Sequence, residues 1–202
     1  MNRVIFLDKD GTLIEDLPYN VDPRRIRLAP GAREAVRLWA EHGWPIAVAT
    51  NQSGVARGYF SLDDLEAVAA HLKATVEELG GTWAGFWACP HLPEGMNEYA
   101  VECDCRKPAP GMIRDAAAQL GVRPDDCWFI GDTWMDMAAG RAAGCPTILV
   151  GPEWRRVSTY PPEAQPDHAV PDIAAAARIT VGDGAADVTA DGTADDRTEV
   201  AS

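Results

Sequence analysis

Residues 4–12 read VIFLDKDGT, so four apolar residues run directly into two acids, Asp8 and Asp10, which are followed by a glycine and a threonine. A short apolar run closed by polar residues is typical of a buried strand. Similar runs occupy residues 46–49, 83–88, 127–130 and 147–150, and residues 168–170 add a shorter one. We therefore expect a sheet whose first strand ends at the acid pair.

Stretches with helical spacing of apolar residues separate these runs. They cover residues 32–41, 111–120, 135–143 and 173–178, and a longer stretch begins at Ser61, a typical N-cap residue, and ends at Gly80. This alternation predicts an α/β fold of the Rossmann-like, three-layer type with a central, mostly parallel sheet. In such folds, ligands bind beyond the carboxyl ends of the strands.

The chain has 202 residues, enough for one domain, which we place at residues 1–179. Residues 180–202 carry six acids and one arginine, a net charge of −5, and almost no large apolar residues. Such a segment buries too little surface to offset its ordering entropy, so we expect a disordered acidic tail.

Composition and charge exclude several classes of protein. The net charge of −13 argues against a nucleic-acid-binding surface. No apolar run approaches the roughly 18 residues of a membrane span, and the acids that end the first apolar run argue against a signal peptide. We therefore expect a cytoplasmic protein, and a monomer, because no apolar surface stripe stands out.

Polar groups with related chemistry lie at the expected strand ends. Thr50 follows the second strand, Asp132 follows the fourth, and Lys107 lies in the loop between the third and the fourth. Carboxylates at one sheet edge repel one another unless a cation lies among them, and oxygen ligands suit Mg²⁺, which shares its shell with phosphate. Together with a hydroxyl and a lysine charge, they predict a site for phosphoryl transfer.

Each of these residues has a simpler interpretation when taken alone. Acid pairs in loops serve solubility, Lys107 would be a solvated surface charge, and Asp132 would cap the helix that follows it. The whole set favours chemistry. Asp8 would be the nucleophile, and Asp10 would protonate the leaving alcohol and then activate a water molecule.

A second group of residues has the composition of a metal site, namely Cys89, His91, Cys103 and Cys105. Three thiolates and one imidazole complete the closed tetrahedral shell of a structural Zn²⁺ ion. Buried small residues or a redox pair are the alternatives. A zinc ion here would stiffen the loop that leads directly into Arg106 and Lys107.

The chain resembles the haloacid dehalogenase superfamily of phosphatases over about residues 1–150, through the motifs DKDGT at 8–12, TN at 50–51, Lys107 and GDTWMD at 131–136. The resemblance implies that Asp8 is the nucleophile, that Asp10 is the general acid and base, and that Thr50 and Lys107 bind the transferring phosphoryl group. It also implies that Mg²⁺ is bound by Asp8, Asp132 and the main-chain carbonyl of Asp10. The short intervals between motifs predict a minimal, uncapped member with a zinc-stabilised loop.

The cysteine loop and residues 51–58 narrow this resemblance to the branch of heptose bisphosphate and histidinol-phosphate phosphatases. By that resemblance, six residues border or contact the substrate: Asp16, Tyr19, Asn51, Gln52 and Ser53, with Arg106 at a distal phosphate. Two positions depart from the pattern, because Lys9 replaces a common arginine and Thr133 replaces a lysine. The second change removes a cation that a second phosphate would use.

We therefore expect hydrolysis of the 7-phosphate of a heptose bisphosphate, with a small sugar phosphate as the partner molecule. Hydrolysis of histidinol phosphate or another small phosphomonoester is the alternative with the same chemistry. A non-catalytic zinc-loop binding module is the alternative from another class.

Overall fold

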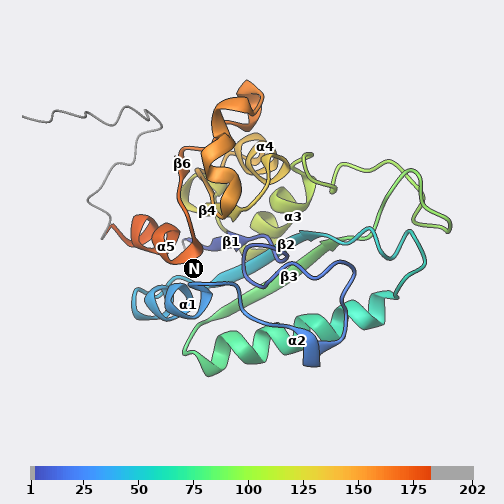
Figure 1. Ribbon diagram of the computed structural model, residues 1–202, viewed down its shortest axis with the longest axis horizontal. Coiled ribbons are helices and arrows are strands. Elements are labelled where there is room, and N and C mark those ends of the chain that lie inside the picture. The colour runs from blue at the N-terminus through green and yellow to red at the C-terminus, as the bar shows by residue number, and fades with distance from the viewer. Residues whose placement is uncertain (1–2, 183–202) are drawn as a thin grey trace, which may run out of the picture.

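A computed structural model describes residues 3–182 (Figure 1). The strands are β1 (Ile5–Leu7), β2 (Ile46–Asn51), β3 (Trp83–Cys89), β4 (Trp128–Gly131), β5 (Thr147–Leu149) and β6 (His168–Ala169). The α-helices are α1 (Ala32–Glu41), α2 (Leu62–Glu78), α3 (Gly111–Leu120), α4 (Trp134–Ala143) and α5 (Ile173–Val181). Short 3-10 helices are η1 (Pro23–Arg25), η2 (Pro124–Asp126), η3 (Pro152–Thr159) and η4 (Pro162–Ala164).

The six strands form one sheet in the order β3-β2-β1-β4-β5-β6, and every neighbouring pair is parallel. The α/β class is therefore confirmed, and the described part of the sheet is wholly rather than mostly parallel. Because all strands run the same way, their carboxyl ends lie along one edge. The three strands that carry the predicted motifs, β2, β1 and β4, are immediate neighbours.

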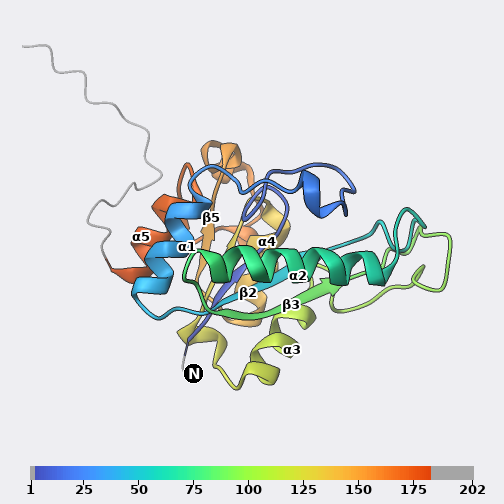
Figure 2. The ribbon, with the colours of Figure 1, turned by 90° about the horizontal axis from the view of Figure 1, so that it is seen from below.

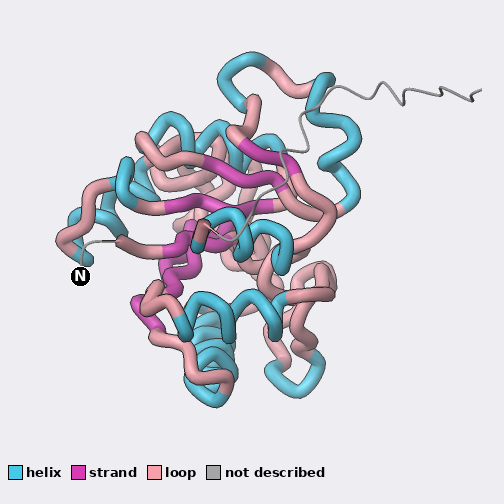
Figure 3. The backbone as a smooth tube through the Cα atoms, turned by 90° about the vertical axis from the view of Figure 1, so that its left-hand side faces the viewer, coloured by secondary structure: helices cyan, strands magenta, loops and turns pink. Residues whose placement is uncertain are grey.

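Alternate residues of the segment 4–7, which contains β1, enter two different cores. Ile5 and Leu7 pack in the core with residues of α1, α2 and α5, while Val4 and Phe6 pack in the core with residues of α3 and α4. Figure 1 shows α1 and α2 on the side of the sheet opposite to α3 and α4, and Figure 2 shows α5 beside α1. Figure 3 shows helices on both sides of the strands. The predicted three-layer arrangement is confirmed.

Several element boundaries differ from the expected ones. β2 continues for two residues past 49, so Thr50 and Asn51 end the strand instead of following it. Residues 151–165, for which the apolar pattern predicts no element, contain η3 and η4. The helix expected at 173–178 runs to Val181, and the buried Trp39 indole donates a hydrogen bond of 2.8 Å to the Thr180 hydroxyl.

The folded part therefore extends beyond the expected boundary at residue 179. The sequence did not predict this extension, because Thr180 counts as a polar residue. In the structure it is buried, and the Trp39 indole satisfies its hydroxyl oxygen. The rest of the predicted acidic tail, residues 183–202, lies outside the described residues.

The connections between strands leave the sheet edge uncapped within the described residues. The segment between β1 and α1 holds only η1 and isolated bridges, including one between Ile14 and Leu28. The segment between β3 and α3 contains no helix or strand. Residues 3–182 also include no helix with the length and apolar content of a membrane span.

Candidate active site

The predicted catalytic residues meet in one cavity at the carboxyl edge of the sheet. A cavity of about 200 Å³ is lined by Asp8, Asp10, Asp16, Thr50, Asn51, Lys107, Asp132, Thr133, Met135 and Asp136. Residues from the ends of β1, β2 and β4 contribute to it, as expected for a parallel sheet. The structure thus brings together the four residues that we expected to be catalytic.

Lys107 is a buried cation in the lining of this cavity, with 3% of its surface exposed. Its ammonium group donates to Asp8 Oδ1 at 2.6 Å and to the Ala49 carbonyl at 3.0 Å, and it also pairs with Asp136. Burial acts to lower the pKa of Lys107, but the charges of Asp136 and Asp8 outweigh it and hold this pKa above its ordinary value. Lys107 is therefore a permanent positive charge beside Asp8.

Asn51 holds the main chain of Lys107 from both sides. Its amide nitrogen donates to the Lys107 carbonyl at 2.9 Å, and the Lys107 N–H donates to its amide oxygen at 3.0 Å. Asn51 was expected to contact the substrate. Its side chain also lines the cavity, so that role stays a prediction, while the hydrogen bonds present place it as a clamp on the lysine loop.

Asp8 and Asp132 both line the cavity and are crowded by other acids. Burial, followed by the neighbouring charges of Asp8 and Asp136, raises the pKa of Asp132 to about 8. Burial also raises the pKa of Asp8 to about 6, against the opposing influence of Lys107. Acids that are hard to ionise in the absence of a cation form a donor set that would gain from a bound one.

A divalent ion fits this donor set. Carboxylate oxygens of Asp8, Asp132 and Asp136 lie within 4.8 Å of one another, and hard oxygen ligands suit Mg²⁺. Asp136 is already paired with Lys107 and accepts hydrogen bonds from Thr133. Asp8 and Asp132 each use Oδ1 in a hydrogen bond, and their Oδ2 atoms accept none from other residues within 3–182. Asp10 lies outside this carboxylate cluster, so only its main chain remains as the ligand that the resemblance implied.

The turn after β1 fits closely against Asp132. Gly11 has φ +80°, and a Cβ atom at this position would overlap the Asp132 carboxylate. The Thr12 hydroxyl donates to Asp132 Oδ1 at 3.4 Å. Only glycine combines this backbone conformation with the close approach that the acid requires.

Thr133, and not Asp132, caps α4. Its side chain accepts a hydrogen bond from the Asp136 N–H, and Asp136 accepts one from the Thr133 N–H at 3.0 Å, which completes a capping box. Capping therefore does not account for Asp132. It does give a structural reason for a threonine at position 133, where the resemblance led us to look for a cation.

A second cavity, of about 240 Å³, adjoins the first and contains the expected substrate residues Asp16, Tyr19, Gln52 and Ser53. Asp10, Asp16 and Asn51 line both cavities. Tyr19 has φ 56°, an uncommon conformation for a tyrosine, and its ring packs edge-on against Tyr59 at a centroid distance of 4.8 Å. The two cavities therefore share part of their lining, and the Tyr19–Tyr59 pair lies at the second one.

Arg106 lies outside the lining of both cavities. Its guanidinium donates to the His91 carbonyl at 3.3 Å, beside the cysteine cluster. The expected contact between Arg106 and a distal phosphate is therefore untested and stays a prediction.

The cysteine and histidine ligands expected for zinc come together as one cluster. Sulfur–sulfur distances among Cys89, Cys103 and Cys105 are 3.3, 3.3 and 3.6 Å, and His91 Nδ1 lies 3.3 Å from the Cys105 sulfur. A tetrahedral zinc ion with Zn–S bonds of about 2.3 Å would space its sulfurs roughly 3.8 Å apart. Burial and the neighbouring thiols raise the pKa of Cys105 above its ordinary value, a cost that a bound cation would reverse.

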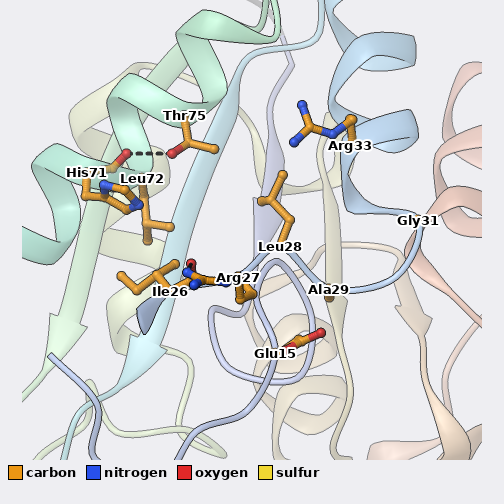
Figure 4. A pocket seen from close by; sticks show the side chains of 10 residues that line it. All are labelled: Glu15, Ile26, Arg27, Leu28, Ala29, Gly31, Arg33, His71, Leu72 and Thr75. Atoms are coloured by element: carbon orange, nitrogen blue, oxygen red, sulfur yellow. Dashed lines mark hydrogen bonds between the residues drawn. The ribbon is translucent and has the colours of Figure 1, made fainter. Parts of the chain in front are cut away.

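A larger cavity, of about 500 Å³, lies between α2 and residues 26–29 (Figure 4). Arg27, Arg33 and His71 contribute to its lining, and none of the expected site residues does. The expected site residues are therefore gathered around the two smaller cavities at the sheet edge, apart from this one.

Sequence reasoning missed two residues that the site contains. Lys9 is buried and pairs with Asp10 at 2.9 Å, and Asp136 pairs with Lys107. Both were noticed in the motifs but were assigned no role. The signals that could have revealed them are a lysine flanked by two acids, and an acid in the first turn of the helix after Asp132.

Comparison with known proteins agrees with this geometry. Residues 104–176 match the family model described as HAD-hydrolase-like. The D-glycero-β-D-manno-heptose-1,7-bisphosphate 7-phosphatase of Pasteurella multocida is 38% identical over 151 residues, which cover 74% of this chain and 82% of the relative. The enzyme of the same name from Pseudomonas aeruginosa is 40% identical over 148 residues, covering 73% and 80%.

A solved structure shows the same arrangement of elements. The D,D-heptose 1,7-bisphosphate phosphatase of B. bronchiseptica, crystallised with magnesium and phosphate, superposes with a TM-score of 0.77 at 31% identity. The superposition covers 91% of this chain and 100% of that one.

The parallel sheet, the acid pair after β1 and the paired lysine define a hydrolase of the haloacid dehalogenase-like class. Within that class, the chain belongs to the family of the heptose-1,7-bisphosphate 7-phosphatases.

Proposed function

We propose that this protein is a magnesium-dependent phosphatase that removes the 7-phosphate of D-glycero-D-manno-heptose 1,7-bisphosphate. The observation that carries the proposal is the contact of 2.6 Å between Lys107 and Asp8 at the end of β1, inside a cavity with a donor set for a divalent ion. Relatives that the chain matches over three quarters or more of their length bear this activity in their names.

In the first step, an Asp8 carboxylate oxygen attacks the phosphorus atom of the ester and the bond from phosphorus to the sugar oxygen breaks. Protonated Asp10 gives its proton to the leaving oxygen, so the product is a neutral alcohol. Thr50 and Lys107 donate to the phosphoryl oxygens during the transfer. The burial of Thr50, at 1% exposed, and of Lys107 keeps water from weakening these interactions.

In the second step, the Asp10 carboxylate takes a proton from a water molecule. The water oxygen attacks the phosphorus of the aspartyl-phosphate, and the bond from phosphorus to the Asp8 oxygen breaks. Inorganic phosphate and the free Asp8 carboxylate result, and Asp10 is again protonated for the next cycle.

Mg²⁺ would neutralise charge on the phosphoryl oxygens when bound. Asp8, Asp132 and the main-chain carbonyl of Asp10 would hold it. Asp136 would act indirectly, because its ion pair with Lys107 keeps the ammonium group oriented toward Asp8.

The substrate's sugar would lie in the second cavity, against Asp16, Tyr19 and Ser53. Asn51 and Gln52 also line this cavity, and they donate hydrogen bonds to Lys107 and Asp10 on its catalytic side. Arg106 would meet the distal phosphate, since Thr133 is committed to the cap of α4. A free sugar phosphate and a single copy of the chain would suffice for this reaction.

We also propose zinc for the cluster of Cys89, His91, Cys103 and Cys105. The spacing of the four ligand atoms and the absence of a disulfide among these residues support this assignment. The ion would stiffen the segment whose last ligand is followed directly by Arg106 and Lys107.

The test is phosphate release by the purified protein with Mg²⁺, comparing both anomers of the heptose bisphosphate with histidinol phosphate and several sugar monophosphates. We expect the highest kcat/KM for a heptose bisphosphate and no turnover by the Asp8→Asn variant. A preference for histidinol phosphate would retain the mechanism and replace the substrate. No turnover with any of them would contradict the proposal and favour a binding module.

A further inference from the structure

The carboxylate of Asp10 is held at both of its oxygens. Lys9 Nζ lies 2.9 Å from Oδ1, and the Gln52 amide nitrogen donates to Oδ2 at 3.0 Å. The Asp10 side chain is 31% exposed and lines both cavities. Without these two contacts, a partly solvent-exposed carboxylate would be free to rotate.

Lys9 is an unusual residue to find in a protein core. It is 1% exposed, and within residues 3–182 its ion pair with Asp10 is the only one it makes. A buried ammonium costs stability unless it is paired, and an apolar side chain of the same length would often stabilise a core at least as well. The pairing with Asp10 is therefore the feature that explains a lysine here.

Gln52 is also buried, and hydrogen bonds from its main chain and its side chain hold it in place. It is 6% exposed, and its main-chain N–H donates to the Cys89 carbonyl at 2.8 Å. Its amide nitrogen uses its two hydrogens for Asp10 and for the Thr50 hydroxyl oxygen, at 3.0 and 2.9 Å. Because Thr50 accepts this bond, its own hydrogen remains available for a phosphoryl oxygen.

We propose that Lys9 and Gln52 are positioning residues that aim the Asp10 carboxyl group at the leaving oxygen of the substrate. The inference rests on the proposed function, in which Asp10 acts as general acid. Lys9 acts through Asp10 alone, whereas Gln52 acts through Asp10 and Thr50. Neither residue needs to touch the substrate.

The test compares leaving groups. The value of kcat/KM covers the reaction up to departure of the leaving group, which requires a proton when it is a sugar alkoxide but not when it is p-nitrophenolate. We expect Lys9→Met to lower kcat/KM for the heptose bisphosphate about tenfold or more, and for p-nitrophenyl phosphate less than about threefold. Lys9→Arg should restore most of the loss, because it keeps a donor beside Asp10.

A double-variant cycle separates positioning from other roles. In an Asp10→Asn background, Lys9→Met should cause no further loss with the heptose bisphosphate. Gln52→Leu removes the bonds to both Asp10 and Thr50, so it should lower kcat/KM for both compounds, and more for the heptose bisphosphate than for p-nitrophenyl phosphate. With this second variant, the inference does not depend on the folding of one variant. Lys73→Met, which removes an exposed lysine paired with Glu77 on α2, is the matched control and should leave both kcat/KM values unchanged.

The inference fails, while the proposed function stands, if Lys9→Met lowers kcat/KM equally for both leaving groups. The same holds if the losses in kcat/KM add in the Asp10→Asn background. A rise in KM for the heptose bisphosphate at unchanged kcat, which is the mark of a direct substrate contact, would also overturn the inference. If the unchanged protein hydrolyses neither compound, the proposed function fails and the inference fails with it.

Discussion

Lys107→Met removes a buried cation and leaves its carboxylate partners, Asp8 and Asp136, in place. The three groups are 3%, 8% and 2% exposed, so solvent screens their interaction little. Breaking a buried pair in this way costs about 3 kcal/mol or more of unfolding free energy. For a domain of this size, that lowers the melting temperature by about 6–12 °C.

The deficit should depend on pH. The pKa of Asp8 is already raised to about 6 by burial, and Lys107 opposes the shift, so its removal raises this pKa further. A carboxyl group whose pKa is higher in the folded than in the unfolded state destabilises the fold above its unfolded pKa, fully so above its folded pKa. The deficit should therefore be largest near about pH 8 and shrink as pH falls through about 6 toward 4.

The assay is thermal unfolding in magnesium-free buffer across that range, with Lys73→Met as the control. The control removes an exposed charge 3.9 Å from Glu77 and should change unfolding free energy by less than about 0.5 kcal/mol. Equal melting temperatures for Lys107→Met and the unchanged protein at about pH 8, or a deficit that grows in acid, would refute this electrostatic account of the site.

Three further predictions use other parts of the site. Asn51→Leu frees the main chain of Lys107, so we expect kcat to fall about tenfold at nearly constant KM in steady-state assays; a change in KM alone would point instead to a substrate contact. Gly11→Ala drives a methyl group into the metal-site carboxylate and should raise the Mg²⁺ concentration needed for half activity, whereas Gly43→Ala, with φ +66° and open space around it, should not. Cys103→Ser should reduce the zinc content found by metal analysis and lower the melting temperature, and full retention of zinc would remove this residue from the ligand set.

Much of the fold could be predicted because its signals are local. The apolar run before Asp8, the cap at Ser61 and the glycines that end helices each act within a few residues. Parallel pairing then brings the strand ends together without further information. For the same reason, the sequence could indicate which catalytic residues converge.

The contacts that hold those residues in place could not be predicted, because they join parts of the chain that are distant in sequence. Asn51 holds Lys107 across 56 positions, and Gln52 reaches Asp10 across 42. Nothing in residues 51–58 distinguishes a side chain that faces the substrate from one that orients a neighbour. The choice of Thr133 over Asp132 as the cap of α4 likewise depends on which side chain turns toward the helix.

The cysteine cluster is joined closely to two parts of the proposed active site, namely Gln52 and Lys107. Cys89 ends β3 and its carbonyl accepts the main-chain hydrogen bond of Gln52, while Cys105 comes two residues before Lys107. Oxidants, thiol reagents and competing heavy metals that attack the cluster would therefore disturb proton transfer and phosphoryl binding together. The enzyme would be sensitive to chemical damage to sulfur, although none of the four cluster ligands lines the catalytic cavity.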